Sequence, residues 1–384
     1  MPKRVVFVSN GYPTKDNPTY AFLAPVVRGL AKSGIKCTVI APQSINKAIR
    51  NKTKVRPFHW VEEIDNNQID IFQPKYLSVP KLRFRGYKYS AYSCIKAIKR
   101  AYRRVGEKPD CFYAHFWDSA INASAILDTD SIPIIVACGE EKIWAKDLYP
   151  NKVFESALKK IKGVICVSTA NYKKCEEEGY LKNNPCSEII VNAYDSSVFY
   201  HIDKKYARSE LGISKDEKIV AFVGTFNERK GIKRLIEAVK PLPEVKLILI
   251  GRGERVEEDE RIVFCGSLPH DKINLYLNAA DVFVLPTLSE GCCNAIVEAI
   301  GCGLPIISSD RDFNDDILNS QYSIRINPED IGMIRDAIKR VLSDEDLLNR
   351  MSWNSIERAK DLTLEKRIER IIEFMERVAE QRSQ

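Results

Sequence analysis

The chain of 384 residues contains only four histidines and four methionines, and it lacks two informative patterns. It has no run of eighteen apolar residues, which excludes a membrane-spanning helix of ordinary length. Its eleven cysteines form no Cys-x-x-Cys pair, and their odd number does not favour a disulfide framework. Several cysteines lie inside apolar runs, as buried free thiols do in a reducing compartment. Residues 1–8 enter a predicted strand at once, so no signal peptide is expected. These features predict a cytoplasmic protein.

The charge is unevenly spread along a chain whose length is typical of two domains. Residues 1–195 carry 31 Lys and Arg against 19 Asp and Glu, whereas residues 196–384 carry 28 against 33. The densest basic stretch is Lys81–Arg104, in which aromatic residues alternate with nine cations. Such a stretch suits an anionic membrane surface or an anionic acceptor. A solvated helix face is the ordinary alternative, and nucleic acid is not expected as a partner.

Short apolar strands alternate with helical patterns throughout, which predicts parallel sheets covered on both faces. The expected strands are Val5–Val8, Cys37–Ala41, Cys111–Ala114, Ile134–Ala137, Val164–Val167, Ile219–Val223, Val245–Ile250, Ile262–Phe264, Val282–Leu285 and Pro305–Ser308. The expected helices are Ala24–Lys32, Tyr89–Arg104, Asp118–Leu127, Gly231–Val239, His270–Ala279 and Asn294–Ile300. Two such sets predict an α/β protein with two Rossmann-like domains that face a central cleft. The boundary between the two domains is expected near Asn192–Tyr200.

The segment Ser289–Ala299 contains two glutamates, Glu290 and Glu298, eight positions apart. An expected strand precedes the segment, and a helix stop of Gly and Pro follows it. Glu290 should therefore lie in a strand-to-helix loop, and Glu298 about two turns into the helix. The unpaired N–H groups and positive dipole end of such a helix hold a phosphate or a polar sugar readily. A carboxylate in the loop can accept sugar hydroxyls, and one on the inward face can accept two ribose hydroxyls.

This segment resembles the Glu-x7-Glu signature of the group 1 retaining glycosyltransferases, which have the GT-B fold and use a nucleotide-sugar. The match includes the apolar strand before the first Glu and the Cys-Gly-Leu-Pro sequence after the second. The resemblance implies an N-terminal acceptor-binding domain, residues 1–195 plus about 364–384, because the last helix crosses back onto it. It implies a nucleotide-sugar-binding domain at residues 196–363. It also places the donor's hexose against Glu290 and the backbone that follows, at Gly291, Cys292, Cys293 and Asn294.

The loop after the strand Ile219–Val223 is predicted to bind a diphosphate and is called the cradle, because it contains a Gly turn, a Lys and the start of a helix. Lys230 matches the lysine of the resembling family and is the candidate to bind the diphosphate. The family has an Arg early in this loop, where this chain has Thr225, and Arg229 is the candidate to replace its charge. A helix-start loop with solvated charges is the alternative. Leu268, after the strand Ile262–Phe264, is a candidate base contact through its main chain. Gly251 and Gly253 do not complete a dinucleotide fingerprint, because Val stands at position 256.

The first half offers three further candidates, each at the end of an expected strand. Gly11 lies in a turn that lets the backbone approach the donor phosphates, although the loop could simply turn there. His115 resembles the His of the family's cleft, where it would position and stabilise without acting as a nucleophile. Glu140 occupies a place at which the family's residues face the acceptor.

The sequence therefore predicts a retaining hexosyltransferase that uses UDP-sugar in preference to GDP-sugar. The expected acceptor is a glycan or lipid-linked glycan at the inner membrane face, in cell-surface polysaccharide synthesis. A sugar-nucleotide 2-epimerase of the same fold is the alternative enzyme, and a binding module without turnover is the third hypothesis. The nucleotide-sugar is a substrate, so no cofactor is expected.

No metal is expected either, because metal-dependent enzymes of this kind need a carboxylate cluster at the donor site. Two Asp-x-Asp sequences are candidates for such a cluster. Asp128 and Asp130 precede a strand and lie at the wrong end for a ligand. Asp310 and Asp312 follow the strand Pro305–Ser308 and are the better rival.

Overall fold

The computed structural model describes residues 2–14, 20–65, 67–79, 81–127, 132–140 and 142–381. Contacts divide the chain into two compact units. The first unit is Met1–Val167, Asn171–Ile190 and Ile368–Gln384, and the second is Ser168–Ala170 and Val191–Arg367. The units thus change after residues 190 and 367, where the sequence placed the domain boundaries at 195 and near 364.

The chain up to residue 190 contains most of the helices and strands of the first unit. They are β1 (Arg4–Val8), α1 (Leu23–Lys32), β2 (Lys36–Ile40), β3 (Gln43–Ser44), α2 (Ile45–Arg50), β4 (His59–Ile64), β5 (Asn67–Phe72), β6 (Lys75–Tyr76), β7 (Arg83–Phe84), β8 (Tyr87–Lys88), α3 (Tyr89–Tyr102), β9 (Cys111–His115), α4 (Trp117–Ile126), β10 (Ile134–Cys138), α5 (Ala145–Leu148), α6 (Asn151–Lys160), β11 (Ile161–Cys166), α7 (Thr169–Glu177) and β12 (Cys186–Ile189).

The main sheet of the first unit has the strand order β12-β11-β10-β9-β1-β2-β5-β4. All neighbours are parallel except β4, which runs antiparallel to β5 at the edge. From β1 the chain builds outward through β2 and β5, and then returns to β9 on the other side of β1. The strand order therefore reverses between β1 and β9, and open parallel sheets bind ligands at the carboxyl ends of the strands at such a switch point.

The second unit continues the alternation of strands and helices. Its elements are α8 (Lys204–Glu210), β13 (Lys218–Val223), α9 (Ile232–Val239), β14 (Val245–Ile250), β15 (Ile262–Gly266), α10 (His270–Ala279), β16 (Val282–Leu285), α11 (Asn294–Gly301), β17 (Ile306–Ser309), the 3-10 turn η1 (Asp312–Asn314), β18 (Ser323–Ile326), α12 (Ile331–Ser343) and α13 (Glu345–Ala359), and α14 (Leu364–Glu380) follows.

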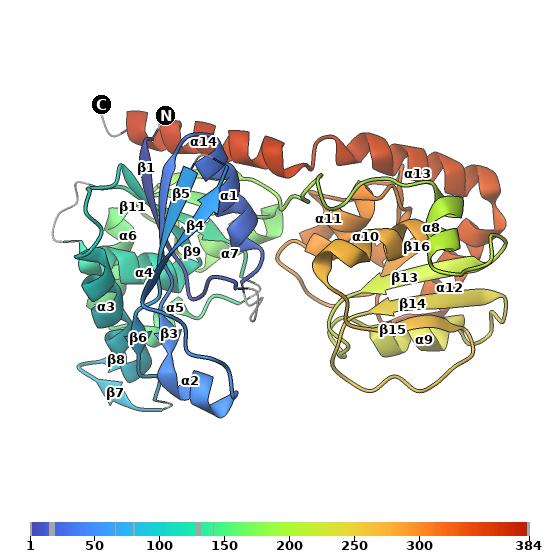
Figure 1. The fold of residues 1–384 in the computed structure, drawn as a ribbon, viewed down its shortest axis with the longest axis horizontal. Coiled ribbons are helices and arrows are strands. Elements are labelled where there is room, and N and C mark those ends of the chain that lie inside the picture. Colours follow the sequence, from blue (N-terminus) through green and yellow to red (C-terminus); the bar gives the residue numbers. More distant parts are fainter. Residues whose placement is uncertain are drawn as a thin grey trace. The chain divides into compact units, whose positions relative to one another are not determined.

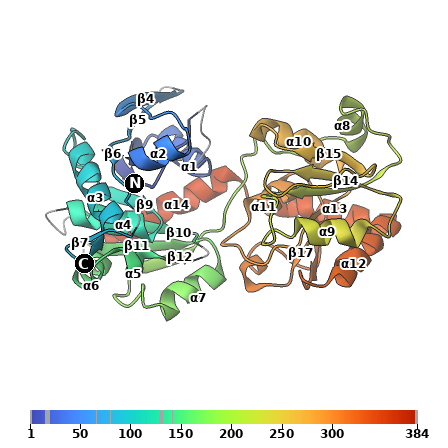
Figure 2. The ribbon, with the colours of Figure 1, turned by 90° about the horizontal axis from the view of Figure 1, so that it is seen from below.

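The sheet of the second unit has the order β15-β14-β13-β16-β17-β18, and its strands are all parallel. Helices α9 and α12 cover one face, and α8 and α10 lie on the other, as Figures 1 and 2 show. β16 is buried along its whole length, as a central parallel strand requires. The order reverses between β13 and β16, so the loops after these two strands flank the switch point of this sheet.

The last helix, α14, packs on the first unit from Ile368 onward (Figure 1). Its apolar face is buried at Ile368, Ile371, Phe374, Met375 and Val378. Two glycines allow the close approach: a Cβ on Gly29 of α1 would lie 2.6 Å from Ile368 Cγ1, and one on Gly163 of β11 would lie 2.8 Å from Val378 Cγ2. Arg370 and Arg377 both pair with Glu188 of β12. The expectation that the final helix returns to the first domain is confirmed.

The ten strands expected from the sequence are all present, with bounds that shift by at most three residues. The sequence missed the short pairs β3–β6 and β7–β8, and it missed the edge strands β4, β12 and β18, together with β5 beside β4. The edge strands contain half-buried or exposed positions, because one of their sides faces solvent. Their residues do not form the continuous apolar runs from which the central strands were predicted.

Candidate donor and acceptor sites

The loop between β13 and α9 lies at the switch point of the second sheet and contains the predicted cradle. Its last residue, Gly231, has φ of 79°, and a Cβ there would lie 2.4 Å from the carbonyl oxygen of Pro286. Only glycine fits such a position without displacing backbone. Because Pro286 follows β16, this contact joins the two loops that flank the switch point.

Two further glycines, Gly251 and Gly253, support the cradle from the side of β14. Gly251 and Gly253 follow that strand, and a Cβ on Gly251 would lie 1.8 Å from the carbonyl oxygen of Gly224. Phe226 donates its backbone N–H to Arg252 O at 2.9 Å, and Glu254 N–H returns a bond to Phe226 O at 2.7 Å. The glycines that failed to make a dinucleotide fingerprint therefore let two backbone segments meet and fix the cradle.

The carboxylate of Glu290 is the centre of the candidate donor site. Its Oε1 lies 2.6 Å from Lys230 Nζ and 2.9 Å from Arg229 Nη1, and it accepts the Thr287 hydroxyl at 2.9 Å. Arg229 also donates to Ser289 O at 2.5 Å. The loops after β13 and β16 thus bring together three residues that the sequence had assigned to the donor.

Lys230 keeps its positive charge although its side chain is nearly buried. Burial lowers the pKa of this amine, but Cys293 and Glu290 raise it by more, so the pKa of Lys230 stays above its ordinary value. The Lys230 ammonium also lies 3.9 Å from Cys293 Sγ. Burial raises the pKa of the Cys293 thiol, so this thiol loses its proton less readily than an ordinary cysteine.

Helix α11 begins at Asn294, as the sequence predicted. Glu298 therefore lies little more than one turn into the helix, and the expected two turns is wrong. The segment Gly291–Cys293 precedes the helix, and Asn192 Nδ2 donates to Cys292 O at 3.0 Å and to Asn294 Oδ1 at 2.7 Å. These bonds fix the backbone whose N–H groups were predicted to hold the hexose.

Glu298 has a partner that the sequence reasoning did not name. Its Oε1 lies 3.0 Å from Nε2 of His270, the first residue of α10. The other two donor candidates lie in neighbouring loops: Thr225 is exposed after β13, and Leu268 is half-buried after β15. No hydrogen bond joins the Thr225 side chain to Glu290 in the described part of the chain.

The switch point of the first unit is lined by different chemistry. Asn10, after β1, donates from Nδ2 to Asp118 Oδ2 at 2.7 Å, and Asp118 lies at the start of α4, after β9. The neighbouring Gly11 is buried against Tyr20, whose ring would be 2.5 Å from a Cβ at this position. Gly11 therefore lies at the predicted edge of the sheet. The ring of Tyr20 fills the space that a side chain at position 11 would need.

His115 ends β9 at the same switch point. Its ring is 4.9 Å from that of Phe22 and 4.4 Å from that of Phe116. Phe116 has φ of 78°, an unfavourable backbone angle for a residue with a side chain. Strained backbone angles are concentrated at functional sites. Here the positive φ of Phe116 turns the chain sharply from β9 into α4.

Glu140, after β10, lies beside Asp118 in this first unit. It accepts the Trp117 backbone N–H on Oε1 at 2.9 Å, and its Oε2 has no hydrogen-bond partner among the described residues. Burial raises the pKa of Glu140 to about 8, and the Asp118 carboxyl adds to the shift. Burial also raises the pKa of Asp118. Two carboxyl groups that resist ionisation therefore line the candidate acceptor edge.

Neither Asp-x-Asp sequence contradicts or establishes the expectation of a metal-free site. Asp310 lies 3.2 Å from Arg325 Nε, and Asp312 begins the turn η1. Asp128 and Asp130 lie outside the described residues. In the described part of the chain no group of three or more His, Cys, Asp or Glu is arranged to hold a metal ion. The absence of a metal requirement stays a prediction.

The basic stretch Lys81–Arg104 forms the β7–β8 hairpin and helix α3 of the first unit. Leu82 and Phe84 are 47% and 42% exposed, so the hairpin presents apolar side chains among its cations. Arg85 lies over the Phe84 ring and Lys96 over the Tyr92 ring, at 5.4 and 4.6 Å from the ring centres. One face of α3 is nevertheless core, at Ala91, Cys94, Ala97, Ile98 and Ala101.

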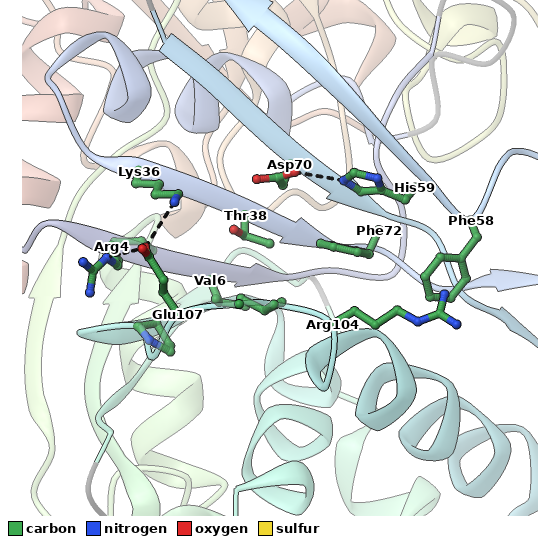
Figure 3. A pocket seen from close by; sticks show the side chains of 14 residues that line it. Arg4, Val6, Lys36, Thr38, Phe58, His59, Asp70, Phe72, Arg104 and Glu107 are labelled. Carbon is green, nitrogen blue, oxygen red and sulfur yellow. Dashed lines mark hydrogen bonds and ion pairs between the residues drawn. The ribbon is translucent and has the colours of Figure 1, made fainter.

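A surface hollow of about 570 Å3 lies elsewhere on the first unit, over β1, β2 and β5 (Figure 3). Its charged groups already pair with one another: Glu107 lies 2.8 Å from Arg4 and 3.1 Å from Lys36, and His59 lies 2.9 Å from Asp70. Arg4 and Lys36 are the first residues of their strands, so the hollow includes the amino ends of β1 and β2. This is not the edge at which parallel sheets bind ligands.

Comparison with known proteins finds a family model and relatives that resemble this chain. The family model described as "Glycosyl transferases group 1" matches residues 203–358, which include the cradle and both glutamates. This part of the chain is similar to the group 1 glycosyltransferases. TuaC of Bacillus subtilis (strain 168), by its name a candidate teichuronic acid biosynthesis glycosyltransferase, is 26% identical over 353 residues and 88% of each chain.

Solved structures show the same GT-B fold. HepE of Anabaena in complex with UDP and glucose is 14% identical and has a TM-score of 0.66 over 98% of this chain and 100% of that chain. The catalytic domain of starch synthase IV of Arabidopsis thaliana, bound to ADP and acarbose, is also 14% identical, with a TM-score of 0.71 over 99% of both chains. Within the described residues, no helix is both long and apolar enough to cross a membrane.

Proposed function

We propose that this glycosyltransferase moves a hexose from a nucleotide-diphosphate donor to a glycan or lipid-linked glycan acceptor, with retention of configuration. The donor is UDP-linked in preference to GDP-linked, and the product belongs to a cell-surface polysaccharide. One observation carries the proposal. Glu290, Lys230 and Arg229 meet at the switch point of the second sheet, in a loop pair that the glycines fix.

The charges of this group suit a donor that brings its own negative charge. Both cations are paired with Glu290, so the nearly buried charge of Lys230 has a partner of opposite sign. A diphosphate competes for the same cations, and its arrival leaves the Glu290 carboxylate free to accept sugar hydroxyls. Binding of the donor therefore exchanges the charge-assisted bonds between Glu290 and the two cations for bonds between the diphosphate and the same cations.

The transfer follows from where charge develops. The bond between the anomeric carbon and the diphosphate oxygen breaks, and the acceptor hydroxyl bonds to that carbon from the same face. The acceptor's proton passes to the leaving diphosphate. Lys230 and Arg229 stabilise the charge that builds on the leaving oxygen, and this stabilisation is larger in the transition state than in the ground state.

The acceptor is assigned to the first unit through Asp118 and Glu140. These buried carboxyls retain protons more readily than ordinary acids, so they can donate as well as accept hydrogen bonds to sugar hydroxyls. The name of TuaC supports a polysaccharide acceptor, and the UDP bound to HepE supports a UDP-linked donor. The ADP bound to starch synthase IV makes an ADP-sugar the third donor to test.

The same two carboxyls are the observation that favours a sugar-nucleotide 2-epimerase as the second candidate. An epimerase needs additional acid–base groups, and groups with raised pKa values are suited to that work. It would convert the nucleotide-sugar without an acceptor. A transferase leaves the donor's C2 configuration unchanged.

A donor panel tests the proposal. The melting temperature is measured with UDP, GDP and ADP, because a ligand that binds only the folded state raises it. The nucleotide-sugar of the best binder is then followed by NMR, alone and with glycan acceptors. We expect the largest stabilisation from UDP and no change in the sugar without an acceptor. Epimerisation of the donor alone would favour the alternative, and failure of all three nucleotides to bind would reject both enzymes.

A further inference from the structure

The contact between His270 and Glu298 belongs to a row of polar side chains along helix α10. His270, Asn274 and Asn278 are spaced by four residues, so they follow one another along one face of the helix. Asn274 and Asn278 are only 4% exposed, although amides are seldom fully buried. A buried polar row of this kind must find partners, and its partners show what it fixes.

The two asparagines fasten α10 to the segment 199–202 and to the end of α11. Asn274 Oδ1 accepts the Tyr200 backbone N–H at 3.1 Å and the Cys302 thiol at 3.2 Å. Asn278 Oδ1 accepts the Ile202 backbone N–H at 2.7 Å, and its Nδ2 donates to Tyr200 O at 3.0 Å. Cys302 directly follows α11, the helix that contains Glu298. The distance between the two helices is therefore set by buried bonds.

His270 is the exposed end of this row. Its side chain is 64% exposed, whereas that of Glu298 is 14% exposed. The imidazole meets the buried ring of Phe199 edge-on, with 4.9 Å between ring centres. Glu298, Asp195 and Asp271 are the charged groups around it, and all three are acidic. The hydrogen bond that His270 donates to Glu298 contributes most to raising the pKa of His270, burial opposes it, and the charges of the three acids add to the increase.

We propose that His270 is a positioning residue for nucleotide binding: it holds Oε1 of Glu298 so that Oε2 faces the ribose hydroxyls. The proposal rests on the proposed function, in which Glu298 accepts the ribose. A free glutamate must lose side-chain entropy when it binds a ligand. The bond from His270 removes part of that loss in advance, because the carboxylate is already oriented.

The pairing makes nucleotide affinity depend on pH. The protonated imidazole bonds to the carboxylate more strongly than the neutral ring does. The contribution is fully present below the ordinary pKa of histidine, and it declines as the pH rises through the raised pKa of His270. Affinity for a ribose-containing ligand should therefore fall with rising pH, whereas a ligand without ribose should not respond through this pair.

Calorimetric titration of UDP and of inorganic pyrophosphate tests this, at about pH 5.5 and about pH 8.5, on either side of an ordinary histidine. His270→Ala should bind UDP roughly 10-fold more weakly at the lower pH, as expected for loss of a hydrogen bond to a charged group. Its affinity for pyrophosphate should not change. His270→Gln can still donate to Glu298 but does not titrate, so it should restore most of the affinity and lose the histidine part of the pH dependence.

The comparison of variants removes the titration of UDP itself, which is common to all of them. Wild-type UDP affinity in His270→Ala at both pH values would overturn the inference. So would an equal loss of pyrophosphate binding, which indicates a general structural role, or a wild-type pH dependence in His270→Gln. If Glu298→Ala loses UDP affinity and His270→Ala does not, the proposed function stands and only this inference fails. If wild type binds no nucleotide, both fail.

Discussion

The two switch points are built from different ionisable groups, and neither follows the charge of its own half of the chain. Residues 1–195 have an excess of Lys and Arg, yet the first switch point is lined by the buried acids Asp118 and Glu140. Residues 196–384 have an excess of acid, yet the second switch point gathers Lys230 and Arg229 around one glutamate. The charge of a site is therefore set by a few residues at strand ends.

The surplus cations of the first unit lie instead on exposed elements. Those of Lys81–Arg104 are on the hairpin and the outer face of α3, away from the core cluster beneath. Such charges act at long range and attract an anionic surface, whereas those at the second switch point act by direct contact. We expect the exposed cations to contact an anionic membrane and the cations of the second switch point to bind the donor, and the following predictions test this difference.

The largest effect is expected at the second switch point. Lys230→Ala should lower transferase turnover by roughly 10²–10³-fold, because it removes a fixed donor from the charge of the leaving group. Lys233→Ala is the matched control, since Lys233 is 65% exposed and pairs with Glu254 outside the site. Initial rates of both variants are compared with wild type. Equal activity of Lys230→Ala and Lys233→Ala would remove Lys230 from the site.

The two signature glutamates should separate binding from turnover. Glu298→Ala should weaken UDP binding by about 1.5–3 kcal/mol, the cost of losing hydrogen bonds to a charged group. Glu290→Ala should mainly lower kcat, because Glu290 pairs with Lys230 and Arg229 and, in the proposed function, accepts the sugar hydroxyls. Calorimetry gives the first quantity and steady-state kinetics the second. Unchanged nucleotide affinity in Glu298→Ala would show that its carboxylate does not bind the ribose.

A smaller effect is expected at the first switch point, where acidity replaces positive charge. Because the pKa of Glu140 is raised to about 8, the folded protein holds a proton that the unfolded chain releases at lower pH. Burial of Glu140 therefore costs the fold no charge-burial energy below the ordinary pKa of glutamate, where the carboxyl is protonated in both states. The free energy of unfolding then falls as the pH rises from that ordinary value to about 8. Wild-type stability should therefore fall more steeply than that of Glu140→Gln between about pH 5 and about pH 8. Urea unfolding measures both, and parallel curves would contradict an uncharged Glu140.

The smallest effect per residue is expected at the surface of the first unit. Each cation near an anionic leaflet contributes about 1 kcal/mol, and salt screens the contribution. Sedimentation with anionic vesicles should be reduced by Arg85→Ala and Lys96→Ala together and by added salt. Neutral vesicles should bind little. Equal binding to neutral and anionic vesicles, or binding that salt leaves unchanged, would argue against contact through Lys81–Arg104.

Much of the fold and part of the site could be predicted from the sequence because they rest on local patterns. The apolar runs gave the central strands, and the loops between strands and helices brought Lys230 near Glu290. His270 was missed because it contacts Glu298, a residue 28 positions away on another helix. Its signal was the four-residue spacing of His270, Asn274 and Asn278 in a helix with a buried face. The raised pKa of Glu140 depends on burial and on Asp118, and sequence spacing reveals neither.

The central claim is that fixed protein cations replace a metal ion at the donor diphosphate. Transfer from the UDP-sugar to its acceptor is measured with and without EDTA, using protein freed of divalent ions. The account predicts the same rate in both, with the product's anomeric configuration retained by NMR. Loss of transfer in EDTA and its recovery with Mn²⁺ would contradict the account, and Asp310 and Asp312 would then be the first residues to substitute.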